Sequence, residues 1–392
     1  MKIIRMNFKC MSVCGFRSFL MLLLVSLAVV GCKEDIKEDA FDSNVLVFDA
    51  KTASFVNLEN IIKSPKFVPL QLTEESGIFR ISKAEILGEN IYLLDPELNK
   101  VLSYNKSGEF VLTISNPGEG PNELDMIVDF CVNDDNETIE LLSPKGKVVS
   151  FDPERGEYVS IINRVGLLSP SYGFARVSDD HFAFYNNLGD FLVKEYSVGK
   201  REVVKSMLPN ELFAEVDWHS IHPFKWRSDK LSLLEMLTST IYGRDPNGDW
   251  GEKWRFDFSE QNFPLDSVTL AEIRAVGDLW PVLEMRNSLY PVSDYYEDAN
   301  FVYLRLLEAA TRQKILLYNK INKNWKIADV TKSGDITLNL SDGFGYRIGV
   351  INDPMEFQMS HPEIIQAGEG WPEINVLTEP NPVLFFYKPI VK

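Results

Sequence analysis

The chain has 392 residues, and its 57 Asp and Glu residues outnumber its 40 Lys and Arg residues, which gives a formal net charge of −17. Because so acidic a surface repels phosphate polymers, the composition argues against a nucleic-acid partner. A chain of this length can bury a large core in a single domain.

The first 31 residues have the composition of a targeting segment. Lys2 begins a basic start of four Lys and Arg residues, and residues 19–30 form an apolar core that is too short to span a bilayer. The sequence Val29-Val30-Gly31-Cys32 resembles the lipobox of bacterial lipoproteins, in which the cysteine is lipidated. The resemblance makes Cys32 the expected lipid anchor and residues 1–31 a lipoprotein signal peptide. An ordinary signal peptide, or a cytosolic protein with an apolar N-terminus, is the alternative.

Residues 32–44 are acidic and lack apolar periodicity, so we expect a flexible tether that holds the folded domain, residues 45–392, away from the membrane. The run from Cys32 to Asp39 is similar to the acidic tether that directs Bacteroidetes lipoproteins to the outer leaflet of the outer membrane. That similarity implies a lipid-anchored, surface-exposed protein of the outer membrane. Removal of residues 1–31 takes away four positive charges and leaves −21, so attachment to the membrane would depend on the lipid.

A pattern of short strands joined by turns begins near residue 91. Residues 91–94, 101–104 and 110–114 are rich in β-branched and aromatic residues, and Asp95-Pro96 and Asn105-Lys106-Ser107-Gly108 supply the turns between them. The same order of elements recurs about 47 residues later, which is the spacing of a propeller blade. The pattern therefore predicts a β-propeller.

Further repeats follow along the chain. Residues 259–290 interrupt the period, and within them we expect a helix at 267–276. A strand at 67–72 contains a proline, which is typical of an edge strand, and we expect it to complete the last blade. The sequence thus predicts an all-β fold, a six-bladed β-propeller of four-stranded antiparallel blades closed by an N-terminal strand. The later repeats are expected at 182–207, 231–258 and 301–330, with the last blade split among 336–340, 345–351 and 382–387.

Five segments carry a family resemblance. They are Lys66–Leu70, Ile91–Asp95, Tyr104–Phe110, the loop Gly118–Glu123 and the terminal Asn381–Leu384. Together they resemble the six-bladed β-propeller lipoproteins of Bacteroidetes, which are related in style to NHL-repeat propellers. The resemblance spans nearly the whole mature chain and implies a fold and a cellular address. It carries no shared catalytic residues, so the catalytic residues of any enzymatic activity remain unassigned.

A tryptophan-rich segment is the best candidate for a binding site. Aromatic faces bordered by hydrogen-bonding groups suit sugars or peptide side chains, although packing inside a blade is the alternative. We expect Trp226 to face solvent, because it lies between His222 and Arg227 and outside the clear strand patterns. Four of the seven tryptophans fall within 37 residues, and the ligand-binding candidates are Trp218, His219, His222, Trp226 and Arg227, with Glu119 from a separate loop.

The loop that contains Glu119 joins the outer strand of one blade to the inner strand of the next. It lies on the face where propellers commonly bind ligands, and a structural turn is the alternative. His219 and His222 have the i, i+3 spacing of a metal pair, but Pro223 would end a helix there. Residues 245–249 begin like a calcium loop yet lack its glycine, so we expect a hairpin turn. We therefore expect neither a metal nor a cofactor.

Cys131 is the one cysteine expected in the folded domain, and it lies within an apolar strand pattern, which predicts an inert core residue. The sequence contains no nucleophile elbow and no dinucleotide fingerprint. We expect a monomeric cell-surface module that binds or scaffolds a glycan or protein partner. The alternative is a carbohydrate hydrolase or lyase that uses channel-facing carboxylates or a metal.

Overall fold

The computed structural model divides the chain into two units, residues 1–42 and 43–392, and all described residues belong to the second. The predicted signal peptide, Cys32, Trp218 and His219 lie outside the described residues. The described residues are 44–49, 51–115, 117–133, 136–163, 167–186, 188–210, 222–227, 230–235, 238–259, 262, 267–276, 281–282, 292–309, 312–329, 336–341, 347–373 and 381–389.

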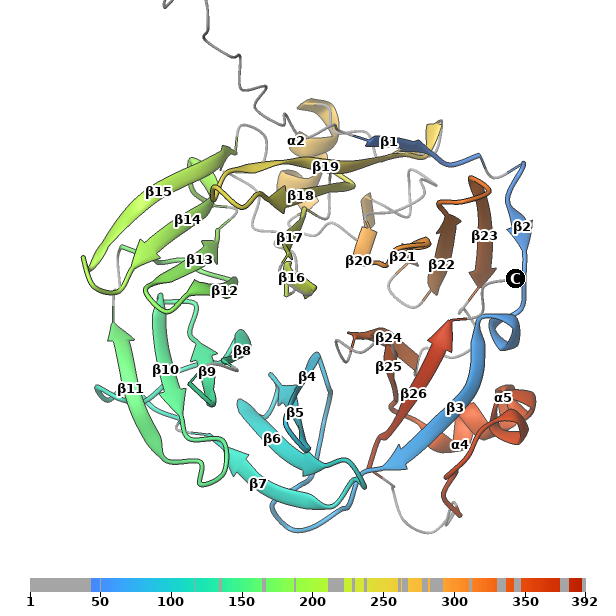
Figure 1. Ribbon diagram of the computed structural model, residues 1–392, viewed down its shortest axis with the longest axis horizontal. Coiled ribbons are helices and arrows are strands. Elements are labelled where there is room, and N and C mark those ends of the chain that lie inside the picture. Colours follow the sequence, from blue (N-terminus) through green and yellow to red (C-terminus); the bar gives the residue numbers. More distant parts are fainter. Residues whose placement is uncertain are drawn as a thin grey trace, which may run out of the picture. The chain divides into compact units, whose positions relative to one another are not determined.

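Six antiparallel sheets surround a common centre in the second unit (Figure 1). Blade 1 contains β4 (Lys83–Leu87), β5 (Asn90–Asp95), β6 (Lys100–Asn105) and β7 (Phe110–Ile114). Blade 2 contains β8 (Asp129–Asn133), β9 (Thr138–Leu142), β10 (Lys147–Phe151) and β11 (Tyr158–Asn163). Blade 3 contains β12 (Gly173–Ser178), β13 (His181–Tyr185), β14 (Phe191–Ser197) and β15 (Glu202–Pro209). The predicted six-bladed propeller is confirmed.

The other three blades follow the same order from the centre outwards. Blade 4 contains β16 (Phe224–Arg227), β17 (Lys230–Glu235), β18 (Thr240–Arg244) and β19 (Trp250–Asp257). Blade 5 contains β20 (Val292–Glu297), β21 (Phe301–Ala309), β22 (Arg312–Asn319) and β23 (Asn324–Asp329). Blade 6 contains β24 (Ile336–Ser341), β25 (Arg347–Ile351), β26 (Val383–Pro389) and β3 (Ile62–Pro69).

The core lies between neighbouring blades, and β5 shows how the sequence produces it. Ile91 and Leu93 pack in a cluster that includes Ile348 of blade 6, whereas Tyr92 packs in the cluster that includes Phe130 of blade 2. Because successive side chains of a strand point to opposite faces, and both faces of a blade are covered, the strand is apolar at nearly every position.

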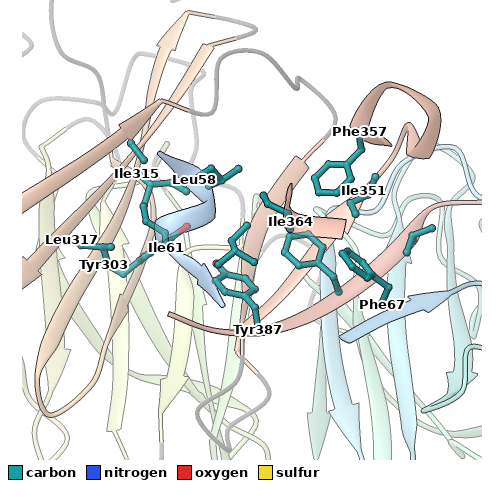
Figure 2. Close-up of a cluster of buried hydrophobic side chains, with 14 residues drawn as sticks. Leu58, Ile61, Phe67, Tyr303, Ile315, Leu317, Ile351, Phe357, Ile364 and Tyr387 are labelled. Atoms are coloured by element: carbon teal, nitrogen blue, oxygen red, sulfur yellow. The ribbon is translucent and has the colours of Figure 1, made fainter. Parts of the chain in front are cut away.

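The ring closes through an N-terminal strand, as predicted. The strand β3 pairs antiparallel with β26, with Phe67 opposite Phe385, although it covers residues 62–69 rather than the expected 67–72. Phe67 also contacts Phe357, whose ring centroid lies 6.4 Å away, in a cluster beneath α4 (Pro354–Ser360) and α5 (Pro362–Ala367) (Figure 2). This pairing joins the two ends of the chain within one sheet.

Two further N-terminal strands were not predicted as parts of blades. The strand β1 (Asn44–Val47) pairs parallel with β19, and β2 (Ser54–Phe55) pairs parallel with β23, each as a fifth outer strand (Figure 1). We call residues 44–69 the N-terminal strap, because they line the outer edges of blades 4, 5 and 6 in turn. The strap thus covers three sheet edges that would otherwise expose unpaired backbone groups.

The sequence prediction missed several innermost strands. The strands β12, β16 and β20 precede the expected starts of blades 3, 4 and 5, so Trp226 lies inside a strand rather than outside one. The predicted helix is confirmed as α2 (Ser267–Val276). In the part of the chain that the structure describes, no helix is both long and apolar enough to cross a membrane.

Candidate functional site

Side chains from blades 1, 2 and 4 meet at the centre of the ring, where the innermost strands begin. Asp129 accepts hydrogen bonds from Lys83 Nζ at 2.9 Å and from His222 Nδ1 at 2.8 Å. The second carboxylate oxygen of Asp129 accepts from the backbone N–H of Phe174 in blade 3 at 3.2 Å. His222 Nε2 lies 3.1 Å from Ser82 Oγ. We call Ser82, Lys83, Asp129 and His222 the channel hub, and it ties four blades together.

Burial and pairing determine the charges of the channel hub. Burial raises the pKa of Asp129, but Lys83 and His222 outweigh that effect and lower it to about 2. Burial lowers the pKa of Lys83, and the charges of Asp129 and Glu85 raise it above its ordinary value. Burial lowers the pKa of His222 more than Asp129 raises it, so the imidazole is neutral near pH 7. The side chains of Asp129 and His222 are buried, whereas that of Lys83 is 12% exposed.

A cavity of about 390 Å³ lies between blades 4 and 5, at the other end of β16 from His222. Its volume is at the lower end of the range of about 300–1,000 Å³ that is typical of small-molecule sites. We call it the inter-blade pocket. Its lining residues are Lys225, Trp226, Lys230, Ser232, Lys253, Tyr295, Tyr296, Glu297, Asp298, Ala299 and Lys320.

Trp226 forms an aromatic wall of the inter-blade pocket, and the residue is 47% exposed. It lies one residue before the end of β16 and pairs with Leu231 of β17. The expectation that Trp226 faces solvent is confirmed. An exposed indole of this size offers a flat face against which a sugar ring or a planar side chain can stack.

Glu297 organises the charges on the opposite wall. Its carboxylate accepts hydrogen bonds from Lys320 Nζ at 2.7 Å and from Trp254 Nε1 at 2.9 Å, and Lys253 Nζ lies 2.8 Å away. Burial raises the pKa of Glu297, but the bonds from Lys253, Lys320 and Tyr295 lower it to about 2. The ionised carboxylate therefore fixes two ammonium groups at the pocket wall.

Residues outside the inter-blade pocket contact three of the side chains that line it. Lys225 Nζ lies 2.8 Å from Asp294 Oδ1. The ring of Tyr296 is held by the guanidinium group of Arg347, which lies 3.8 Å from the ring centroid. Lys320 also lies over the Trp254 ring, 5.7 Å from its centroid. These contacts hold Lys225, Tyr296 and Lys320 at the pocket walls.

The predicted site residues are divided among different places. Trp226 lines the inter-blade pocket, whereas His222 belongs to the channel hub and is buried. Arg227 pairs through its backbone with Lys230, next to the pocket. Glu119 is exposed in the loop between blades 1 and 2, where its carboxylate lies 3.9 Å from Lys145 Nζ. The structure therefore brings together neither Glu119 nor His222 with Trp226.

Trp250 and Trp254, the other two tryptophans of the tryptophan-rich segment that the structure describes, have supporting positions. Trp254 donates to Glu297 behind the pocket wall, and Trp250 packs against Phe224 with the ring centroids 5.9 Å apart. Sequence analysis missed the lysines, tyrosines and Glu297 that complete the pocket, because they come from four strands of two blades and from the turn after β22. One signal was present. Tyr318-Asn319-Lys320 repeats Tyr104-Asn105-Lys106, which marks Lys320 as a residue at the start of a turn.

The calcium-loop-like segment and Cys131 occupy the structural positions that the sequence predicts. Residues 245–248 form the expected turn, in which the N–H of Gly248 donates to the carbonyl of Asp245 at 3.0 Å. Cys131 is buried as expected, and burial raises the pKa of its thiol well above the ordinary value. Among the described residues, no three His, Cys, Asp or Glu side chains are grouped so that they could hold a metal ion.

Comparisons with known proteins concern the fold. The family model described as Domain of unknown function (DUF4934) matches residues 44–388. The chain is similar to a crystal structure from Bacteroides fragilis NCTC 9343, described as a "putative exported protein", with a TM-score of 0.70 and 15% sequence identity over 89% of this chain and 100% of that chain. A member of the DUF4221 family from Bacteroides vulgatus ATCC 8482 has a TM-score of 0.53 and 12% identity over 83% of this chain and 96% of that chain. Comparison with curated proteins gives no match.

Proposed function

The chain belongs to the DUF4934 family, and from this premise we propose that it is a lipid-anchored propeller of the outer membrane that binds a glycan or protein partner at the cell surface. The inter-blade pocket is the binding site. The Bacteroides fragilis relative, which is described as exported, supports a location outside the cytoplasm. The lipobox-like sequence that ends at Cys32 supports the lipid anchor.

The observation that carries this proposal is the half-exposed indole of Trp226 at the wall of a cavity of about 390 Å³. A ligand that covers this exposed ring removes its apolar surface from water and gains contact area there. Hydrogen-bonding groups surround the ring, as binding sites for sugars and peptides require.

The alternative, a carbohydrate hydrolase or lyase, needs acidic groups that can reach a substrate. Asp129 and His222, at the centre of the ring, are buried and bonded to each other. Glu297 in the inter-blade pocket is engaged by two lysines and stays ionised, so it is a poor proton donor near pH 7. The geometry therefore favours binding.

The test is Trp226→Ala measured on a glycan array and a surface-protein array. Binding should weaken by about 2 kcal/mol or more, roughly 30-fold in Kd, while the unfolding free energy changes by less than about 1 kcal/mol. Phe79→Ala is the matched control, since Phe79 is an exposed aromatic residue outside the pocket. Unchanged binding by Trp226→Ala, or an equal loss in Phe79→Ala, would remove the pocket from the proposal.

A further inference from the structure

We infer that the inter-blade pocket selects saccharides that carry an anionic substituent, a carboxylate or a sulfate. The sugar ring stacks on Trp226, and the substituent lies against the ammonium groups of Lys253 and Lys320. This inference rests on the proposed function, and it adds the class of ligand.

The charge of the pocket lining favours an anionic ligand. The lining holds four lysines against the carboxylates of Glu297 and Asp298, and Asp294 behind Lys225 is a third carboxylate. One positive charge is therefore in surplus at this place, on a chain whose formal net charge is −17. A concave, partly buried site concentrates such a field, so an anion is attracted here and repelled by the rest of the surface.

The hydrogen-bond donors of Lys253 and Lys320 also favour an anionic ligand. An ammonium group has three N–H donors and no acceptor. Lys253 is 2.8 Å from Glu297, and Lys320 uses two donors, one to Glu297 and one to the carbonyl of Asp298, each at 2.7 Å. Since one carboxylate serves both lysines, the pair keeps donors and one unit of charge for an incoming anion. Charge-assisted hydrogen bonds to that anion are stronger than neutral ones.

The acidic surface around the pocket favours a saccharide over an acidic protein. An acidic protein would bring many like charges against a strongly acidic surface, whereas a saccharide with a single charged substituent keeps its charge within the pocket. The pocket cations are lysines, which act as point charges and require no planar, bidentate partner, so they accept sulfate as well as carboxylate. Trp226 supplies the flat apolar face that one side of a sugar ring needs.

The experiment is an array of neutral, carboxylated and sulfated glycans, probed with the folded domain, followed by titration calorimetry. The best anionic binder is compared with its methyl ester or its desulfated form, which removes the charge and keeps the sugar. We expect the charged form to bind at least tenfold more tightly. Whether the ester pair or the sulfate pair shows the difference identifies the substituent.

Substitutions of single lysines test whether the preference for the charged form arises in the inter-blade pocket. Lys320→Gln should weaken binding of the charged form about tenfold or more and leave the neutral form nearly unchanged. Lys106→Gln is the matched control, because Lys106 occupies the same position after the third strand of blade 1 and is outside the pocket. Lys230→Ala is a second test at an exposed residue, and melting curves check that each variant folds.

The outcomes separate the two proposals. Equal binding of charged and neutral forms, or equal losses in Lys320→Gln and Lys106→Gln, would overturn the inference and leave a glycan-binding pocket. Binding of a hexaglutamate peptide without any glycan would overturn the saccharide class and leave a protein partner. If the folded domain binds neither glycans nor proteins through Trp226, both proposals are wrong.

Discussion

Asp129→Asn should destabilise the propeller strongly, because it breaks the channel hub at its centre. Asp129 is 1% exposed, and its carboxylate accepts from Lys83, from His222 and from the backbone of blade 3. The substitution keeps the shape but removes the buried counter-charge of Lys83, whose side chain is 12% exposed and which then keeps only one ion pair, with the partly exposed Glu85 at 2.8 Å. Removing one partner of a buried ion pair typically costs about 3–5 kcal/mol.

The pH dependence gives a second estimate of how much Asp129 contributes to the free energy of unfolding. The pKa of Asp129 falls from 3.8 to about 2 on folding, so the carboxylate contributes about 2 kcal/mol of stability. This stability is fully present above pH 3.8 and is lost as the pH falls towards 2. The lowered pKa of His222 acts in the same direction, since the unfolded chain binds a proton below pH 6.5 that the folded chain resists. Stability should therefore rise with pH up to about 6.5.

The assay is urea unfolding followed by tryptophan fluorescence at pH 7 and at several values down to pH 3. Asp249→Asn is the matched control, since it breaks an exposed pair with Lys205, for which we expect a change below about 1 kcal/mol. Asp129→Asn should also flatten the wild-type loss of stability below pH 4. A shift below about 1 kcal/mol at pH 7, with unchanged pH dependence, would refute the view that the channel hub ties the blades together.

Three further predictions concern the anchor, the N-terminal strap and one turn. Fatty-acid labelling should mark the wild-type chain and be lost in Cys32→Ala, and an unlabelled wild type would contradict the anchor. Deletion of residues 1–43 should leave the melting temperature unchanged, deletion of 1–61 should lower it, and deletion of 1–69, which removes β3, should lower it furthest; equal melting would contradict the closure. Gly108→Ala should cost about 1–3 kcal/mol in thermal unfolding, because Gly108 has φ +85° and a Cβ would lie 2.2 Å from the Pro69 carbonyl oxygen, whereas Gly77→Ala, with open space, should be neutral.

The sequence predicted the outer three strands of most blades because local signals determine them. Turns such as Asn105–Gly108 are specified by their own side chains: Asn105 Oδ1 accepts from the N–H groups of Ser107 and Glu109. Strands covered on both faces are apolar throughout, so their positions can be read without tertiary information. The closing strand was identified from its proline and its position before the first blade.

The innermost strands β12, β16 and β20 were missed for a physical reason. They carry Arg176, Lys225 and Asp294, which break the apolar pattern in the middle of short segments. These charges are tolerated because each has a partner on another strand: Arg176 pairs with Glu140 of blade 2, and Lys225 with Asp294 of blade 5. Such pairs join residues far apart in the sequence, so no local pattern predicts them.

The inter-blade pocket also shows where sequence reasoning succeeds and fails on function. The exposure of Trp226 was predicted, but for the wrong reason, since the residue lies in a strand and not outside one. The clustering of aromatic residues was a real signal. The lysines gave none, because an excess of positive charge at one place is invisible in a chain whose overall charge is negative.

Equivalent positions in blades 1 and 5 place a lysine in two different environments. The backbone N–H of Lys106 donates to a carbonyl in the first turn of blade 1, and that of Lys320 does so in blade 5, so the two lysines are equivalent. The Lys106 side chain is 50% exposed and pairs with an exposed glutamate, whereas Lys320 is 22% exposed and shares Glu297 with a second lysine. An exposed pair contributes little to stability, whereas a partly buried, shared carboxylate holds its cations in place. The repeated backbone thus supplies the position of the lysine, and the neighbouring blade determines which carboxylate it pairs with.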